Sequence, residues 1–373
     1  MTIVEVNDKK TAKEFIDLPR KLYKDDPNFI SPLDKDVEAV FDPALNNFHK
    51  HGICKRWLLK INGVLSGRIA AFINYEKNKN RDSLIGGIGF FECINNQDAA
   101  SLLFDTAKKW LKQNQATAMD GPVNFGENDK YWGLLVEGFV PPSMGMNYNP
   151  PYYQQLFEQY GFEKQYDQFT NVITVAKPFP ERFNKIADWI AKKPEYKFVH
   201  FENNQFEKFA ADFQEIYNDA WSEFEDFTPI QLDTIRQSFR EMRPIVDEKI
   251  IWFTYHNEEP IAFILALPDI NVLLKPLNGK MDLWNKLKFL WYKKTTTIDR
   301  IRFIVMGCKK KFQNKGIESG MIRRLQIEVL PRNTIREAEL AWVGDFNKKM
   351  IALHEATGAH REKVHRTYRY KFN

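Results

Sequence analysis

Residues 307–317, Gly-Cys-Lys-Lys-Lys-Phe-Gln-Asn-Lys-Gly-Ile, combine four lysines, two glycines and the start of a predicted helix. An apolar run from Ile301 to Met306 predicts a strand before them, and apolar residues spaced by four from Ile317 predict the helix after them. The first amides of a helix have no partner within it and lie at the positive end of its dipole. Gly316 allows the backbone to approach a ligand closely. The segment therefore predicts a site for a phosphate group.

Two halves of the chain show the same order of predicted elements around this segment. Asn62-Gly63 is a strong hairpin signal between two apolar runs, and residues 256–260 separate two more. Gly63 and Gly161 lie 98 residues apart, and Glu259 and Gly358 lie 99 apart. After each hairpin we expect a strand, an amphipathic helix, a short strand, a helix ended by glycine and a last strand: 85–93, 99–111, 118–119, 152–160 and 170–175 in the first half, and 301–306, 317–325, 339–343, 348–357 and 367–372 in the second.

This repeated order resembles the GNAT acyltransferase fold, a mixed sheet with helices on both faces. The turn Gln313-Asn314-Lys315-Gly316 resembles motif A of that family, although the family has Gly or Ala where this chain has Glu318. A carboxylate there either weakens a phosphate site or lies on the outer face of the first helical turn. Residues 121–125 and 149–153 are similar to segments of bacterial tandem GNAT proteins. The predicted fold is therefore α/β, with tandem GNAT-like domains at 1–178 and 179–373.

The resemblance implies where acyl-CoA would bind. The pantetheine amides would pair with the backbone of Met306, Gly307 and Cys308. The pyrophosphate would meet the amides of the loop, from Gln313 through Asn314, Lys315 and Gly316 to Ile317. We expect Cys308 itself to be an ordinary buried thiol rather than a nucleophile.

Residues 342–358 resemble motif B of the same family. Asn347 matches a motif position, and the family's Tyr, which often protonates the departing thiolate, falls on His354. Histidine can give or take a proton near neutral pH, so we predict Asn347 and His354 as catalytic residues. A partly buried histidine with no role in catalysis is the alternative.

The first half lacks a phosphate loop. Asp98 falls where its helix should begin, and a carboxylate there would cap the helix and repel a pyrophosphate. We therefore expect the first domain to have no CoA site and to form a wall of the acceptor site. The loop from Asn124 to Asn149 is expected either to contact the acceptor or to pack the two domains together through its acidic and aromatic side chains, Glu127, Asp129, Tyr131, Trp132 and Tyr148.

The insert at 271–297 carries an apolar helical face formed by Leu283, Trp284, Leu287, Leu290 and Trp291, with five lysines around it. We expect this face to dock on the rest of the protein. Contact of residues 280–294 with an anionic membrane surface, or covering of a long acyl chain, are the alternatives.

Composition limits the other possibilities. The net charge of +5 over 373 residues suits an anionic small ligand but is too small to predict a DNA partner. Three scattered cysteines indicate a reducing compartment without structural zinc. No run reaches the length of a membrane span, so we expect a cytoplasmic protein that needs no metal.

Together these features predict an acyl-CoA-dependent N-acyltransferase with one active site, in the C-terminal domain. The donor would be acetyl-CoA or a longer acyl-CoA, and the acceptor an unidentified small-molecule amine. Two alternatives stay open: a Fem-type aminoacyltransferase that uses aminoacyl-tRNA, and an acyl-CoA-binding protein that is not an enzyme.

Overall fold

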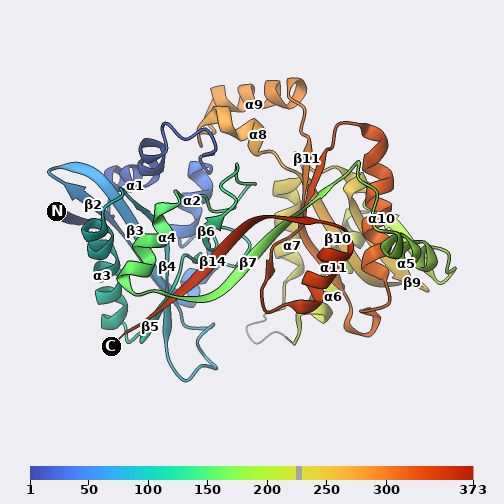
Figure 1. The fold of residues 1–373 in the computed structure, drawn as a ribbon, viewed down its shortest axis with the longest axis horizontal. Coiled ribbons are helices and arrows are strands. Elements are labelled where there is room, and N and C mark those ends of the chain that lie inside the picture. Colours follow the sequence, from blue (N-terminus) through green and yellow to red (C-terminus); the bar gives the residue numbers. More distant parts are fainter. Residues whose placement is uncertain (224–228, 373) are drawn as a thin grey trace.

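A single sheet of 14 strands runs through the part of the chain that the computed structural model describes, residues 1–223 and 229–372. Neighbouring strands follow the order β1-β2-β3-β4-β5-β14-β7-β12-β11-β10-β9-β8, while β6 pairs with β14 and β13 with β7. The strands are β1 (Thr2–Glu5), β2 (Gly52–Ile61), β3 (Val64–Asn74), β4 (Ile85–Cys93), β5 (Ala118–Gly121), β6 (Leu134–Glu137), β7 (Glu163–Thr174), β8 (Tyr196–His200), β9 (Ile251–His256), β10 (Glu259–Pro268), β11 (Arg300–Cys308), β12 (Glu337–Glu339), β13 (Val343–Gly344) and β14 (His360–Lys371). Both halves of the chain thus share one sheet (Figure 1).

Helices cover both faces of the sheet in each half. The helices are α1 (Lys9–Leu22), α2 (Asp34–Phe41), α3 (Gln97–Gln113), α4 (Tyr152–Tyr160), α5 (Glu181–Ala191), α6 (Phe206–Trp221), α7 (Leu232–Met242), α8 (Asn271–Leu274), α9 (Leu283–Thr295), α10 (Ile317–Val329) and α11 (Lys348–Ala356). In the first half, α3 and α4 pack around Phe104 on one face, and α1 and α2 pack around Phe15 on the other. In the second half, α5, α10 and α11 pack around Met321, and α6 and α7 around Phe253. The same layering therefore occurs twice, as the repeat in the sequence predicts.

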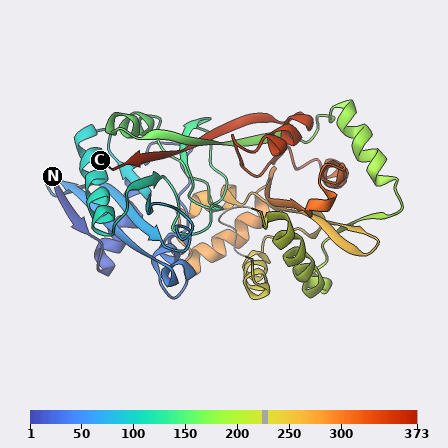
Figure 2. The ribbon, with the colours of Figure 1, turned by 90° about the horizontal axis from the view of Figure 1, so that it is seen from below.

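The last strands of the two halves are exchanged. β7 belongs to the first half of the sequence but pairs with β12 of the second, with Ile173 opposite Ala338. β14 ends the second half and pairs with β5 of the first, with Tyr370 opposite Met119. β7 and β14 also pair with each other, and Figure 2 shows them as long ribbons that cross from one half to the other. Each half therefore needs a strand of the other to complete its part of the sheet.

Several predicted elements are confirmed at both ends, including the strand Ile85–Cys93 and the helix Tyr152–Tyr160. Gly161 has a φ of 102° and ends that helix, as its position in the sequence predicts. The Asn62-Gly63 turn joins β2 to β3, and both residues have positive φ. At these places the local sequence pattern was sufficient to predict the structure, because the turn-forming residues and the hydrophobic periodicity indicate the same elements.

Two predictions are wrong in part. The predicted strand 339–343 divides into β12 and β13, because the Leu340 N–H donates to Asn171 O and the chain follows β7 from that point. The first-half helix α3 is capped by Asn96, whose side chain accepts a hydrogen bond from the Ala99 N–H, and not by Asp98. A cap still closes this helix N-terminus, so the consequence for ligand binding is unchanged.

Candidate active site

Two parallel strand pairs occupy corresponding places in the two halves: β4 with β5, and β11 with β12. The first pair is joined from Ile85–Ala118 to Gly87–Asp120, and the second from Arg300–Glu337 to Arg302–Glu339. Beyond these residues the neighbouring strands separate. Each half therefore contains a place where the sheet opens between two parallel strands.

In the first half this opening is filled by the chain itself. The Val123 N–H donates to Ile88 O at 2.8 Å, and a Cβ added to Gly89 would lie only 2.1 Å from Val123 O. The backbone passes too close to β4 to leave room for a ligand at this position. Asn96 also caps α3, which makes the helix N-terminus on this side less available to a phosphate.

In the second half no described main chain enters the opening. After Glu339 the chain follows β7, and among the described residues β11 beyond Arg302 pairs only with β10. The Lys309 N–H donates to Ile261 O at 2.8 Å. Because main-chain groups of an antiparallel strand point alternately to its two sides, Met306 and Cys308 direct theirs toward the opening. These are donors and acceptors of the kind that an amide-containing ligand needs.

The N-terminus of α10 lies directly beyond the end of β11. Gly316 precedes it with a φ of 83°, and no side chain caps the helix. The first main-chain bond within the helix runs from Gly320 N–H to Gly316 O, so the amides of residues 317–319 have no main-chain acceptor inside it. The Glu318 N–H donates to its own carboxyl, which leaves the amides of residues 317 and 319 free. Gln313 closes the loop over the strand, because its Nε2 donates to Cys308 O at 3.1 Å. The predicted anion site thus has the main-chain geometry that it needs.

Three of the four loop lysines are already paired. Lys309 Nζ lies 3.0 Å from a Glu259 carboxylate oxygen and also contacts Glu215. Lys311 pairs with the other Glu259 oxygen at 3.0 Å, and Lys310 pairs with Glu223 at 3.1 Å. These ion pairs offset much of the positive charge that the three lysines bring to the loop.

Lys315 is the exception, since its Nζ lies over the Phe312 ring and no ion pair is found for it within residues 1–223 and 229–372. The free positive charge of the loop comes mainly from this side chain and from the helix dipole.

Glu318 turns inward rather than lying on the outer face of the helix. It is half-buried, hydrogen-bonds with the Cys308 thiol, and burial raises the pKa of its carboxyl. Burial thereby favours the neutral form, which reduces the repulsion that this residue would exert on a phosphate. Cys308 is buried too, and burial followed by the nearby Glu318 raises the pKa of its thiol. Such a thiol stays protonated and is a poor nucleophile.

His354 is buried on α11, and burial lowers its pKa to about 4. Its Nδ1 lies 2.9 Å from Asn171 Nδ2 on β7. An amide nitrogen can only donate, so Nδ1 accepts and the imidazole proton lies on Nε2. Asn347 serves as the N-cap of α11, where its side chain accepts a hydrogen bond from the Met350 N–H at 3.2 Å. Asn347 thus orients the helix that carries His354.

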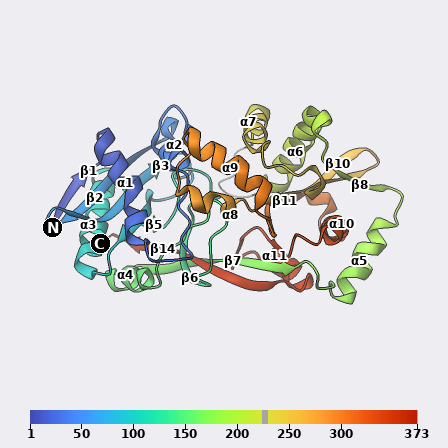
Figure 3. The same ribbon diagram turned by 90° about the horizontal axis from the view of Figure 1, so that it is seen from above.

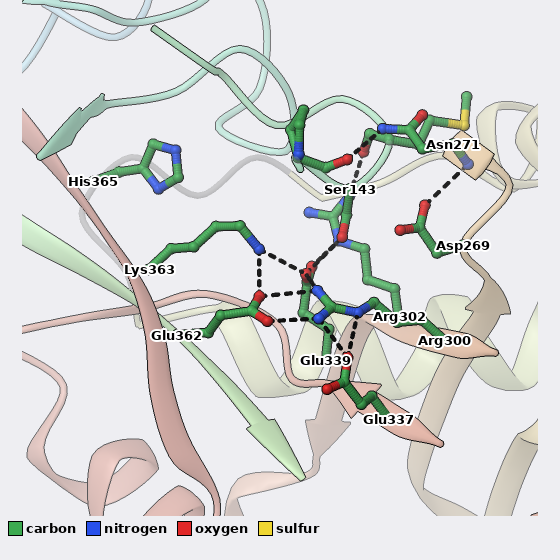
Figure 4. A network of polar contacts seen from close by, with 12 residues as sticks. Ser143, Asp269, Asn271, Arg300, Arg302, Glu337, Glu339, Glu362, Lys363 and His365 are labelled. Carbon is green, nitrogen blue, oxygen red and sulfur yellow. Dashed lines mark hydrogen bonds and ion pairs between the residues drawn. The ribbon is translucent and has the colours of Figure 1, made fainter. Parts of the chain in front are cut away.

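A cluster of charged side chains from β11, β12 and β14 gathers on one face of the sheet, across the intervening strand β7 (Figure 4). We call it the charge cluster; its members are Arg300, Arg302, Lys363, Glu337, Glu339 and Glu362. Ile301 and Ala338 belong to the core under α10. Because side chains alternate along a strand, the neighbouring members of the cluster on β11 and β12 point to the opposite face.

Glu339 is the centre of the charge cluster and is 0% exposed. Its Oε2 accepts a hydrogen bond from Ser143 Oγ at 2.5 Å and lies 3.3 Å from Arg300 Nη1. Its Oε1 lies 3.0 Å from Arg302 Nε, but the two atoms are not aligned as a hydrogen bond. Oε1 therefore keeps an unused acceptor position beside the point where β11 and β12 separate.

Glu362 and Lys363 complete the charge cluster from β14. Burial would raise the pKa of Glu362, but hydrogen bonds from Arg300 and the charge of Lys363 lower it to about 2. Next along the strand, His365 Nε2 lies 3.0 Å from Asn147 O, and burial lowers the pKa of this imidazole to about 3. His365 Nδ1 and the neighbouring Trp132 Nε1 have no partner among the described residues. Unpaired buried polar atoms of this kind are usually met by water or a ligand.

The loop 124–149 lies at this face, and its aromatic and acidic side chains differ in their burial. Trp132 is buried between Trp342 and His365, with ring centres 5.4 and 4.7 Å away. Tyr131 is buried as well, and Tyr148 donates to Asp26 at 2.7 Å, so the aromatic members pack the structure. Asp129 is different: its residue is exposed to solvent, yet surrounding protein raises the pKa of its carboxyl.

A cavity of about 90 Å³ adjoins the charge cluster. Ser143 lines the cavity and donates to Glu339. Most of its wall is apolar, including Phe29, Leu33, Met144 and Leu274, with Arg68 and Glu92 among its polar members.

The sequence did not predict Ser143, Arg302 and Glu339 as residues of the candidate site. A signal for the two charged residues was present, because the segments Arg-Ile-Arg-Phe at 300–303 and Glu-Ala-Glu at 337–339 alternate charged and apolar residues. Such alternation predicts strands with one charged face. Ser143 carries no comparable signal.

Comparison with known proteins places the chain in a family. No family model matches it. Protein YghO of Escherichia coli strain K12 is 30% identical over 374 residues, covering 96% of this chain and 93% of YghO. The chain belongs to the YghO family. A protein named bacterial ceramide synthase from Caulobacter vibrioides is 28% identical, covering 99% of this chain and 97% of that protein.

Solved structures identify the fold of this YghO relative. A tandem GNAT protein from the clavulanic acid biosynthesis pathway superimposes with a TM-score of 0.57 at 11% identity, covering 99% of this chain and 98% of the other. A GCN5-related N-acetyltransferase from Sphaerobacter thermophilus gives 0.52 at 12% identity, covering 99% and 95%. The fold is a tandem GNAT fold, as predicted.

Within the described residues, no helix is long and apolar enough to cross a membrane. No group of three or more His, Cys, Asp or Glu side chains is arranged to hold a metal ion in that same part of the chain.

Proposed function

We propose that this protein transfers an acyl group from acyl-CoA to the amine of a long-chain amino alcohol, at one active site in residues 179–373. The observation that carries the proposal is the opening between β11 and β12, with the uncapped N-terminus of α10 beside it. The acceptor class is supported by the relative named bacterial ceramide synthase, since a ceramide is the fatty amide of such an amine. The filled opening beside Gly89 supports the absence of a second CoA site in residues 1–178.

The donor would bind on the α10 side of the opening. Main-chain groups of Met306 and Cys308 point into it and can pair with the amides of pantetheine. The free amides of residues 317 and 319 and the ammonium of Lys315 suit the pyrophosphate. The Glu318 carboxyl is turned toward Cys308, and burial raises its pKa, which reduces its repulsion of the pyrophosphate.

The acceptor would enter from the opposite face, where the charge cluster lies. Glu339 Oε1 has an unused acceptor position that can orient an amine N–H. The apolar cavity next to Ser143 can take up part of the carbon chain. The amine and the thioester would then meet through the opening, which supplies the orientation that aminolysis needs.

In the reaction, the amine nitrogen attacks the thioester carbonyl carbon, the C–N bond forms and the C–S bond breaks. The amine proton passes to water. We propose that His354 stabilises the leaving group, which is the CoA thiolate. A pKa of about 4 keeps its imidazole neutral, so its Nε2–H would stabilise the departing thiolate through a hydrogen bond.

The test is to incubate the purified protein with acetyl-CoA or palmitoyl-CoA and with sphinganine, and to measure released thiol and the amide product by mass spectrometry. Formation of the amide with matching thiol release supports the proposal. Binding of acyl-CoA without product, after a screen of amines, would favour an acyl-CoA-binding protein. Failure to bind either CoA would refute the donor site and favour an aminoacyl-tRNA donor.

A further inference from the structure

Helix α9 presents a row of large apolar side chains to solvent. Leu283, Trp284, Leu287, Leu290 and Trp291 are between 52% and 76% exposed, and none of the 13 residues of the helix is buried. The helix lies on the outside of the molecule where the two halves meet (Figure 1, Figure 3). The expectation that this face docks on the rest of the chain is therefore wrong. A contiguous exposed apolar face of this kind indicates a binding surface.

The other side of α9 holds the helix in place. Phe289 and Tyr292 pack against a cluster of buried leucines that includes Leu273 and Leu277. The Asp282 side chain caps the helix by accepting from the Asn285 N–H at 3.0 Å. The helix cannot turn its exposed face inward without losing these contacts, so the exposed face is a fixed feature of the fold.

Lysines border the apolar face. Successive helical residues are about 100° apart, which places the five apolar side chains within an arc of about 120°. Lys286 and Lys293 fall on one border of that arc, Lys288 on the other, and Lys294 at its C-terminal end. Asp282 is the only acidic residue between Lys280 and Thr295. The surface is therefore apolar at its centre and positive around it.

This pattern selects among the possible partners. Two copies of the chain that met through this face would bring their lysine borders together, and the like charges would oppose association. An anionic bilayer offers a nonpolar interior below a negative surface, which matches an apolar centre with a basic border. Tryptophan and lysine are also the residues that favour the boundary between lipid and water.

We propose that α9 docks flat on the surface of an anionic membrane, with Trp284 and Trp291 inserted at the level of the headgroups. The underside of α9 packs on Leu274, which also lines the cavity beside the charge cluster. Docking would bring that region of the protein close to the lipid. The inference does not depend on acyl transfer, because it rests on the surface of α9 alone.

The test is flotation of the full-length protein with phosphatidylcholine vesicles that contain or lack phosphatidylglycerol. Wild-type protein should float with the anionic vesicles, and less so as salt is raised. The double variant Trp284→Ser with Trp291→Ser should bind at least about tenfold more weakly. Lys286→Gln with Lys288→Gln should lose about 30-fold on anionic vesicles, since each lysine near such a surface adds about a factor of five.

Trp189→Ser is the matched control, because Trp189 is 55% exposed on α5, a helix at one end of the molecule and away from α9 (Figure 1). It should bind vesicles like the wild type. The altered side chains are all exposed, so circular dichroism should show unchanged folding in every variant. The proposal is overturned if the wild type does not float with anionic vesicles, or if the α9 variants float as well as Trp189→Ser does. It is also overturned if light scattering shows a dimer that the tryptophan changes dissociate.

Discussion

Substituting Gly316 by aspartate should weaken CoA binding far more than substituting it by asparagine. Gly316 has a φ of 83°, and a Cβ there would lie 2.6 Å from Ile186 Cγ2. Any side chain therefore strains this position, by about 1–2 kcal/mol for the left-handed backbone alone. Aspartate and asparagine have the same shape and both tolerate positive φ, so they share this strain. Their difference isolates the effect of a negative charge at the start of α10.

The size of that effect follows from Coulomb's law. A carboxylate about 5 Å from one phosphate charge costs about 0.8 kcal/mol in water and about 3 kcal/mol at an effective dielectric constant of 20. A pyrophosphate presents about two such charges, so the lower limit is about 1.6 kcal/mol, or about 15-fold in Kd. Because the site is at the surface, the difference should shrink as salt is added.

Isothermal titration of both variants with CoA, and with pantetheine as a ligand without phosphate, gives the measurement. We expect the aspartate variant to lose CoA affinity but to bind pantetheine as the asparagine variant does. Thermal unfolding should show the aspartate variant at least as stable as the asparagine variant, since a carboxylate favours a helix N-terminus. Equal CoA affinity in the two variants would refute the assignment of this loop as the pyrophosphate site.

Three further predictions concern the surrounding groups. Glu318→Gln should tighten CoA binding about threefold to tenfold in the same titration, because it removes a carboxylate at the helix N-terminus; weaker binding would contradict this. His354→Ala should lower turnover with sphinganine and palmitoyl-CoA while leaving CoA affinity unchanged, and an unaffected rate would remove His354 from the mechanism. Burial lowers the pKa of His354 to about 4 and of His365 to about 3, whereas an unfolded histidine titrates near ~6.5. The unfolded state therefore binds more protons below pH ~6.5, and each histidine should cost about 2 kcal/mol of stability at pH 5. Denaturant unfolding at pH 7.5 and pH 5 should show a smaller loss for His365→Gln than for the wild type, and equal losses would disprove it.

Much of the local structure could be read from the sequence because it depends on nearby residues. The hairpin at Asn62-Gly63, the strand Ile85–Cys93 and the helix Tyr152–Tyr160 each follow from turn chemistry and hydrophobic period within a short window. The loop proposed to bind phosphate was located in the same way, since a strand, a glycine and a helix start are adjacent in the chain.

The ion pairs of that loop and the protonation of its side chains could not be predicted from the sequence. Lys309 and Lys311 are paired with Glu259, about 50 residues earlier in the chain, and Lys310 with Glu223. Glu318 repels a phosphate less than its sequence position suggests, because burial against Cys308 raises the pKa of its carboxyl. Both outcomes depend on which side chains the fold brings into contact and on how much water it removes, and neither quantity is encoded locally.

The sequence by itself determined the two repeated halves, the tandem GNAT architecture and the chemical character of the loop before α10. These depend on periodicity and on short motifs, which act over a few residues. Only the tertiary structure decided that β7 and β14 are exchanged between the halves, and that Ser143 meets Glu339 across 196 residues of sequence. It also decided that the apolar face of α9 stays in solvent. Strand partners and burial are set by the competition of the whole chain for contacts, so these features appear only once the sheet is assembled.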